Sequence, residues 1–242
     1  MSERSIKIFG IRISKLSDSS FLEYIKSGIE KNRKIIIGYA NADTLNKIYD
    51  NKELRDIYES FDLIHPDGVG VYSASRILLG NDGLESRLTG SDFYPFLIDE
   101  SIKNNWKIFF FGHSDKILGS IQKKHPLLKI AGMNEGYNFD DEKVIEKINI
   151  ADPDILIMGL SCPKQEIWIY NNKDKINFRV ALNVGDGIKV FAGKKVRGPV
   201  ILRKAGLEWF SRLISEPSNN FSKYVAGIPL FIYRIMKEKL NN

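Results

Sequence analysis

Cysteine is almost absent from this chain, which has 242 residues and a single cysteine, Cys162. One thiol excludes both an internal disulfide framework and a cysteine-rich zinc site. Disulfides accumulate in oxidising compartments, so their exclusion is typical of a protein that works in a reducing environment. We therefore expect a cytoplasmic location.

Long apolar segments are also missing. No apolar run reaches the length of about twenty residues that a helix needs to cross a bilayer. The opening residues MSERSIKIFG do not lead into a long apolar segment, so we expect no signal peptide. The sequence therefore predicts that nothing in the chain spans a membrane.

Two common phosphate-binding fingerprints do not occur. No G-x-G-x-x-G follows an expected strand, and there is no G-x-x-x-x-G-K-S/T. The first motif holds dinucleotides and the second cradles nucleotide phosphates. Their absence argues against hydride transfer and against P-loop phosphoryl transfer.

The net charge of +6 is unevenly placed along the chain. Residues 193–242 hold ten Lys or Arg against three Asp or Glu, whereas the rest of the chain holds 26 against 27. The body is close to neutral and the tail carries the excess. A basic tail indicates an anionic partner, whether phospholipid, pyrophosphate or nucleic acid.

Short apolar segments alternate with amphipathic ones. We expect helices over 44–61, 68–80 and 91–105, the last capped by Ser91, and strands over 34–40, 62–65, 107–112, 128–132, 154–160 and 178–185. Apolar strands separated by helices are typical of a parallel sheet covered on both faces. We predict an α/β fold with a mostly parallel, Rossmann-like sheet over 1–195. Strands stop beyond Pro199, and a basic, amphipathic helical appendage is predicted over 196–242.

The segment LIHPDGVGVY places Asp67 between Pro66 and Gly68, directly after an expected strand. Ligands of parallel sheets bind beyond the carboxyl ends of the strands, so Asp67 is expected at the ligand edge. It either caps the helix that starts near Gly68 or acts as a general base. The two roles do not exclude each other.

Other post-strand residues have side chains suited to ligands. The Gln165 amide offers both a donor and an acceptor, and the planar guanidinium of Arg87 suits a pyrophosphate. Lys164 either neutralises a phosphate or is simply solvated. Cys162 has no obvious base beside it, so we interpret it as a packing residue.

Candidate metal ligands are poorly placed. Asp152 and Asp154 precede the strand at 154–160 and lie at the wrong edge of the sheet, where a turn is expected. No two of the histidines have the spacing of a zinc site, and His65 is expected in the core. The sequence therefore predicts no metal site. The three histidines are His65, His113 and His125.

Six motifs occur in one order along the chain. They are ANADTL, HPDGVG, RLTGSD, ADPDILIMGLSCPKQE, NVGDGIKVFAG and GLEWFSRLISEP. Each is weak alone, but the ordered set resembles the bacterial WecG/TagA/CpsF glycosyltransferases from about Ile35 to the C-terminus. The resemblance implies an inverting, metal-independent transfer of an N-acetylmannosamine-like or related hexose. The donor would be a nucleotide sugar, expected to be UDP-linked, and no cofactor is expected.

The same resemblance implies a lipid-linked acceptor, a sugar on undecaprenyl diphosphate, in cell-surface polysaccharide or teichoic acid synthesis. The enzyme would be peripheral on the inner face of the bacterial cell membrane. Asp67 matches the family's general base, and Asn41, Gln165 and Arg87 match donor or phosphate contacts. We place Arg212, Lys204 and Lys223 at the acceptor diphosphate, of which Arg212 matches a family residue.

The chain departs from the family pattern in more than one place, and one departure bears on the donor. NVGDGIK carries Lys189 where the family commonly has aspartate, with Asp186 three residues earlier. We assign both residues to the donor pocket. A lysine at this position suggests the hypothesis that the donor sugar is more acidic than in the relatives.

The tail combines apolar and basic residues at helical spacing, interrupted by Pro229. We expect these segments to lie on an anionic membrane surface. Two alternatives stay open: the helices pack on the domain, or they form a homo-oligomer interface. The apolar residues are Leu202, Trp209, Leu213, Phe221, Tyr224, Ile228, Phe231, Ile232 and Ile235.

Two rival functions belong to other classes. A non-catalytic, membrane-associated binder of sugar nucleotides or lipid-linked sugars would bind ligands without turnover. A nucleic-acid binder would use the aromatic and basic tail, but no known binding module occurs, so we expect no nucleic-acid partner.

Overall fold

The computed structural model describes residues 5–195, 198–204, 206–215, 217 and 221–241. Its centre is a sheet in the order β4-β3-β8-β7-β5-β6, in which every neighbouring pair is parallel. The strands are β3 (Ile35–Ala40), β4 (Leu63–Pro66), β5 (Ile108–Gly112), β6 (Ile130–Asn134), β7 (Ile155–Gly159) and β8 (Val180–Asn183). The predicted α/β, Rossmann-like architecture is confirmed, and each predicted strand lies within two residues of its observed bounds.

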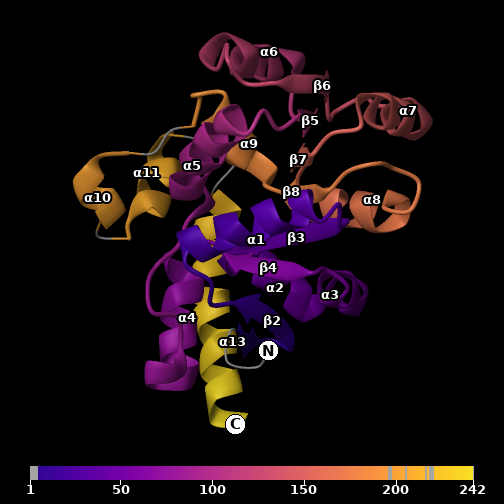
Figure 1. Cartoon of the computed structure of the whole chain (residues 1–242). Helices are drawn as coiled ribbons and strands as arrows, with labels where there is room; N and C mark the ends of the chain where they lie inside the picture. Colours follow the sequence, from indigo (N-terminus) through magenta and orange to yellow (C-terminus); the bar gives the residue numbers. More distant parts are fainter. Residues whose placement is uncertain (1–4, 196–197, 205, 216, 218–220, 242) are drawn as a thin grey trace.

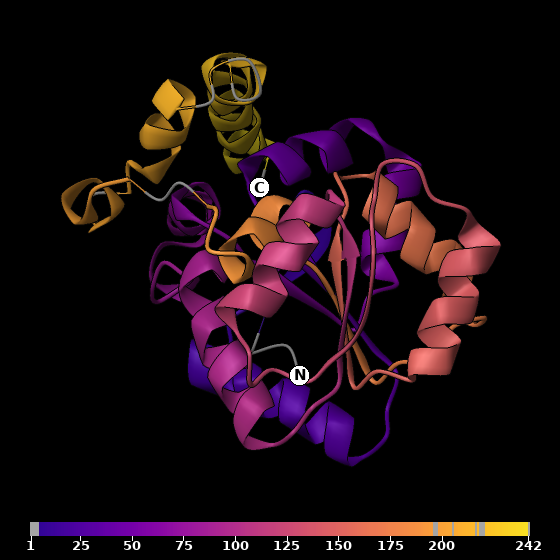
Figure 2. The ribbon, with the colours of Figure 1, turned by 90° about the horizontal axis from the view of Figure 1, so that it is seen from above.

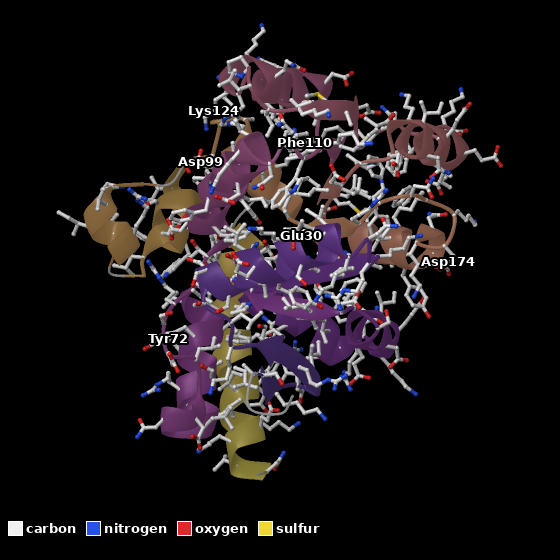
Figure 3. The ribbon with its side chains drawn as sticks, in the orientation of Figure 1. Glu30, Tyr72, Asp99, Phe110, Lys124 and Asp174 are labelled. Atoms are coloured by element: carbon white, nitrogen blue, oxygen red, sulfur yellow. The ribbon has the colours of Figure 1, made fainter. Side chains whose placement is uncertain are left out.

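Helices cover both faces of the sheet, as continuous apolar strands require. One face packs on α1 (Asp18–Glu30), α5 (Gly90–Lys103), α6 (Asp115–Lys124) and α9 (Ile188–Phe191). The other core contains residues of α2 (Ala42–Asp50), α3 (Lys52–Glu59), α4 (Val69–Leu79), α7 (Asp141–Ala151), α8 (Lys164–Asn172) and α13 (Gly227–Asn241). Figure 1 shows these layers, and in Figure 3 the buried Phe110 of β5 lies within them while Asp174 lies at the outer edge.

Two helix predictions were wrong in detail. Residues 44–61 fall in two helices, because Asn51 adopts extended backbone angles and its side chain accepts the N–H of Leu54 at 3.0 Å, which starts α3. Thr89, not Ser91, caps α5, since its hydroxyl accepts the N–H of Asp92 at 3.2 Å. In both places a polar side chain caps a helix through a local hydrogen bond.

A hairpin at the start of the chain was not anticipated. β1 (Ser5–Ile8) and β2 (Ile11–Ser14) pair antiparallel around Phe9 and Gly10, both with positive φ. Its isoleucines are buried in the same core as α13, and β2 lies beside β4. The hairpin therefore closes one end of the body.

The C-terminal segment is helical in the part that is described. It comprises α10 (Val200–Lys204), α11 (Glu208–Ser215), the π-helix η4 (Ser222–Ala226) and α13. In both views α10 and α11 lie to one side of the body (Figures 1 and 2). Among the described helices, none is both long and apolar enough to cross a bilayer.

Helix α13 packs against α2 and α4. Phe231 and Ile235 are buried, and the Arg234 guanidinium bonds the Asp50 carboxylate at 2.6 and 2.7 Å. Pro229 does not end the helical segment, which continues from the π-helix η4 directly into α13. The alternative that tail helices pack on the domain therefore holds for α13. The division into 1–195 and 196–242 stays a prediction.

Candidate active site

A cleft of about 580 Å³ opens at the carboxyl edge of the sheet. Its walls are the segments that follow β3, β4, β5, β6, β7 and β8, joined by residues of the C-terminal segment. Parallel sheets bind ligands at this edge. Of the predicted site residues, the cleft brings together Asn41, Asp67, Gln165, Asp186, Lys189 and Lys223.

Asp67 is held at the end of β4 by two hydrogen bonds. Its N–H donates to the Ala40 carbonyl at 2.8 Å, and its Oδ1 accepts the N–H of Gly90 at 3.0 Å. It does not cap α4: the N-cap is Gly68, with φ of 91° and no side-chain cap. The capping interpretation is therefore wrong. The carboxylate lies on the cleft wall, and its Oδ2 has no hydrogen bond with a described residue.

A second cavity of about 290 Å³ lies between α4 and α13, and we call it the groove. Arg87 lines this groove and is not among the residues that line the cleft, so the structure does not bring it together with Gln165. The cleft and the groove share one wall, to which Asp67 belongs. The shared residues are Asn41, Asp43, Asp67, Lys223 and Tyr224.

Asn41 and Gln165 both line the cleft, but their side chains also form hydrogen bonds with other residues of the protein. Asn41 caps α2, its Oδ1 accepting the N–H of Thr44 at 3.0 Å. The Gln165 amide donates to Glu166 at 2.8 Å and to the Asn183 carbonyl at 3.2 Å, and accepts the N–H of Gly185 at 3.1 Å. Gln165 therefore also fixes the turn after β8, and its contact with a donor stays a prediction.

Glu166 lies in the first turn of α8 and is buried inside the protein. It is 1% exposed, and its Oε1 accepts hydrogen bonds from Gln165 and from the Tyr58 hydroxyl, the latter at 2.9 Å. Burial raises the pKa of Glu166, although these hydrogen bonds favour its charged form. Burial also raises the pKa of the Cys162 thiol, which agrees with the interpretation of Cys162 as a packing residue.

Asn183 is a site residue that the sequence analysis missed. It ends β8, lines the cleft and is 1% exposed, yet neither Oδ1 nor Nδ2 has a hydrogen-bond partner among the described residues. Buried amides are nearly always paired in proteins, so this one points to a ligand or an ordered water. The signal was available, because a polar residue directly follows the apolar residues VAL.

Asp186 and Lys189 form an ion-pair group with Lys195 at the cleft. The Lys189 ammonium lies 3.0 Å from Asp186, and Lys195 pairs with the same carboxylate. Burial acts to raise the pKa of Asp186, but the two lysines outweigh it and leave that pKa below its ordinary value. The charge of Lys189 is thus partly balanced, and its proposed preference for an acidic sugar stays a hypothesis.

The chain was also compared with known proteins. The sequence profile described as the Glycosyl transferase WecG/TagA/CpsF family matches residues 6–242. The chain belongs to this family. The predicted resemblance is confirmed, and the protein is a glycosyltransferase.

Relatives of this glycosyltransferase share one name, "N-acetylglucosaminyldiphosphoundecaprenol N-acetyl-beta-D-mannosaminyltransferase". The protein of Bacillus subtilis (strain 168) is 32% identical over 228 residues, covering 92% of this chain and 88% of the relative. That of Bacillus spizizenii is 26% identical, covering 91% and 86%, and that of Staphylococcus aureus (strain MW2) is 28% identical, covering 97% and 93%.

Of the predicted acceptor contacts of this WecG/TagA/CpsF protein, the structure describes only the side chain of Lys223. Lys223 lies on the wall between cleft and groove, 3.8 Å from the Asp43 carboxylate, which also pairs with Lys47 at 3.1 Å. The side chains of Arg212 and Lys204 lie outside the described part of the chain. Their roles stay predictions.

The Asp-x-Asp segment has a structural role at the opposite edge of the sheet. Asp152 pairs with Arg179 and Lys107, and the Asp154 carboxylate accepts the N–H of Lys107 at 2.7 Å. These contacts agree with a structural role for the segment, and the turn stays a prediction. Within the described ranges, no three His, Cys, Asp or Glu side chains gather as a metal site. Metal independence of the reaction stays a prediction.

His65 gives the fold a specific pH dependence. The ring is fully buried against Phe21, its nitrogens have no hydrogen-bond partner among the described residues, and burial lowers its pKa to about 4. The unfolded chain takes up this proton near pH 6.5, so stability falls as the pH drops from 6.5 towards 4, by about 3 kcal/mol. We expect the His65→Leu variant to lack this part of the stability loss when the free energy of unfolding is measured by urea titration near pH 6.5 and near pH 4. An unchanged loss would show that other groups cause it.

Proposed function

We propose that this enzyme transfers N-acetylmannosamine or a related hexose from a UDP-linked donor to a sugar on undecaprenyl diphosphate, with inversion and without a metal. The names of the three relatives describe such an N-acetylmannosaminyl transfer to N-acetylglucosaminyldiphosphoundecaprenol. The observation that carries the proposal is the position of Asp67, on the wall between a polar cleft and an apolar groove.

The cleft suits the donor. Five lysines line it: Lys47, Lys164, Lys189, Lys195 and Lys223. Lys47 and Lys223 share the Asp43 carboxylate, and Lys189 and Lys195 share that of Asp186. Without a metal, the charge that develops on a departing nucleoside diphosphate has to be stabilised by such groups. The amides of Asn41 and Asn183 then serve to orient the donor sugar.

The chemistry requires one proton acceptor. The acceptor hydroxyl oxygen forms a bond to the anomeric carbon while the bond from that carbon to the phosphate oxygen breaks. The hydroxyl proton passes to the Asp67 carboxylate, and the nucleoside diphosphate leaves with the electron pair. Inversion requires attack from the side opposite the leaving group. We place the donor in the cleft and the acceptor in the groove, so that the hydroxyl attacks from the side opposite the nucleoside diphosphate. Asp67 lies on the wall between the two cavities, where its carboxylate can take the hydroxyl proton.

The decisive experiment is a donor screen with a short-chain prenyl-diphosphate N-acetylglucosamine acceptor, measuring released nucleoside diphosphate. We expect release from UDP-N-acetylmannosamine or a related UDP-hexose only when the acceptor is present. Donor binding without turnover across the whole panel would instead support the non-catalytic binder. The panel should include a uronic-acid donor, because equal turnover of neutral and acidic donors would contradict the hypothesis about Lys189.

Membrane association is part of the proposal and has separate support. Exposed apolar side chains occur on α10, α11 and α13 beside lysines and arginines, an arrangement that suits the headgroup layer of an anionic bilayer. We expect salt-sensitive binding to phosphatidylglycerol vesicles and none to oligonucleotides. The reverse result would support the nucleic-acid binder. The exposed residues include Ile201, Phe210, Ile214, Leu230, Tyr233 and Leu240. A homo-oligomer stays an open prediction.

Replacing Asn183 tests the donor side of the cleft. Because its amide has no hydrogen-bond partner in the described part of the chain, Asn183→Ala should leave stability nearly unchanged and weaken donor binding roughly tenfold. Gln165→Ala is the matched comparison, since it leaves Gly185 without its acceptor and should cost about 1–3 kcal/mol of stability. Calorimetric titration with the donor and urea unfolding measure the two effects. Wild-type donor affinity in Asn183→Ala would show that the amide holds only water.

A further inference from the structure

The groove has the form of an apolar channel between two helices. Helices α4 and α13 run side by side (Figure 1) and pack against each other. The groove side of α13 shows a helical repeat of apolar residues, and α4 faces it across the channel. On these two helices the apolar lining residues include Ala74, Ile77, Ile228, Phe231, Ile232 and Ile235, and Trp209 of α11 also lines the groove.

The groove is not filled by the protein's own packing. Ile77 and Ile232, on opposite walls, remain 43% and 52% exposed. From Gly70 to Ile77 the wall extends roughly 10 Å along the axis of α4. Apolar side chains that face one another across an open channel indicate an apolar ligand.

The two ends of the groove differ in chemistry. The inner end reaches Asp67 and Asn41, and Lys223 lies on the shared wall, 3.8 Å from the Asp43 carboxylate. Arg87 also lines the groove, and it precedes Leu88, whose carbonyl accepts the N–H of Gly68 at the start of α4. The rest of the lining is mostly apolar, with the polar side chains of Ser73 and Glu208 among it. A ligand that fits has a polar head at Asp67, an anionic group next to it and an apolar chain beyond.

We propose that the groove between α4 and α13 binds the proximal prenyl units of the acceptor lipid, with the diphosphate held near Arg87 and Lys223. The inference rests on the proposed function, which supplies a lipid-linked acceptor. It adds that the enzyme recognises the lipid chain directly, in a protein groove, and does not leave all of it in the bilayer. The sugar hydroxyl then meets Asp67 from the groove side.

Binding can be tested without any donor. Calorimetric titration with geranyl diphosphate and with inorganic pyrophosphate separates the prenyl chain from the anionic group. Because burial of apolar groups from water is favourable, we expect wild type to bind geranyl diphosphate at least about tenfold more tightly than pyrophosphate. Trp209 lines the groove, so its emission should change with the prenyl compound and not with pyrophosphate.

Matched variants locate the site. Ile232→Ser makes the groove polar and Ser73→Phe fills it, so both should abolish the preference for geranyl diphosphate while pyrophosphate binding persists. Leu230→Ser is the control, since Leu230 is also exposed on α13 but does not line the groove. It should retain the preference. Equal affinity of wild type for both compounds, or an equal loss in Leu230→Ser, would overturn the proposal.

Turnover distinguishes this proposal from the proposed function. Acceptors that carry N-acetylglucosamine diphosphate as a methyl ester or as a geranyl ester should differ at least about tenfold in kcat/KM in wild type and much less in Ser73→Phe. Equal turnover of both esters would refute the groove and leave the transferase activity intact. A prenyl preference in binding, with no turnover of any donor, would refute the transferase activity and leave the groove intact.

Discussion

Replacing Asp67 by asparagine is expected to lower turnover by about 10²–10⁴-fold, the usual contribution of a general base, while the fold and the donor affinity stay close to wild type. Asparagine has nearly the same shape, and its Oδ1 can still accept the N–H of Gly90. It cannot take the proton of an acceptor hydroxyl. The measurement is the release of nucleoside diphosphate with donor and acceptor both saturating, so that weakened binding does not contribute.

Asp43→Asn provides the control for this experiment. Asp43 lines the same wall and carries the same charge, but it pairs with Lys47 at 3.1 Å and Lys223 at 3.8 Å. Its loss changes the charge of the wall without removing the proposed base, so we expect less than about a tenfold effect on turnover. An equal loss in both variants would assign the effect to charge. Near-wild-type turnover in Asp67→Asn would remove Asp67 as the base.

The location of Asp67 could be predicted, but not the way in which it is held. An apolar strand followed by Pro-Asp-Gly places a carboxylate at the ligand edge of a parallel sheet by local rules alone. The capping role was wrong because Gly68 takes positive φ and turns the chain away, and because Gly90 supplies the N–H. That partner belongs to another segment, so local patterns do not reveal it.

The same distinction explains the other outcomes. The strands follow from unbroken apolar runs, whereas the N-terminal hairpin turns at Phe9-Gly10, which is not among the Asn-Gly or Asp-Gly pairs that mark such turns. Arg87 lines the groove because α13, far along the chain, forms the opposite wall. Tertiary packing decides which cavity a residue lines, and a single sequence gives little information on such long-range contacts.

Replacing Phe231 by alanine is expected to lower the free energy of unfolding by about 3–5 kcal/mol, which is typical for a buried phenylalanine. Phe231 is 4% exposed, and its ring meets Phe9 of the hairpin edge-on at 6.0 Å. Glu238 accepts the N–H of Phe9 at 3.1 Å, and Arg234 bonds Asp50. Through these contacts α13 joins the two ends of the chain, so its loss should destabilise the whole body.

The control is Ile232→Ala, the next residue on the helix, which is 52% exposed and should change stability by no more than about 0.5 kcal/mol. Urea unfolding of both variants, followed by circular dichroism, measures the difference. A single transition, shifted only in Phe231→Ala, would show that α13 unfolds together with the sheet. If the appendage were an independent unit beyond residue 195, Phe231→Ala would instead release the tail early and leave the main transition in place. The experiment therefore also decides whether the helix that forms one wall of the groove is a fixed part of the active-site scaffold.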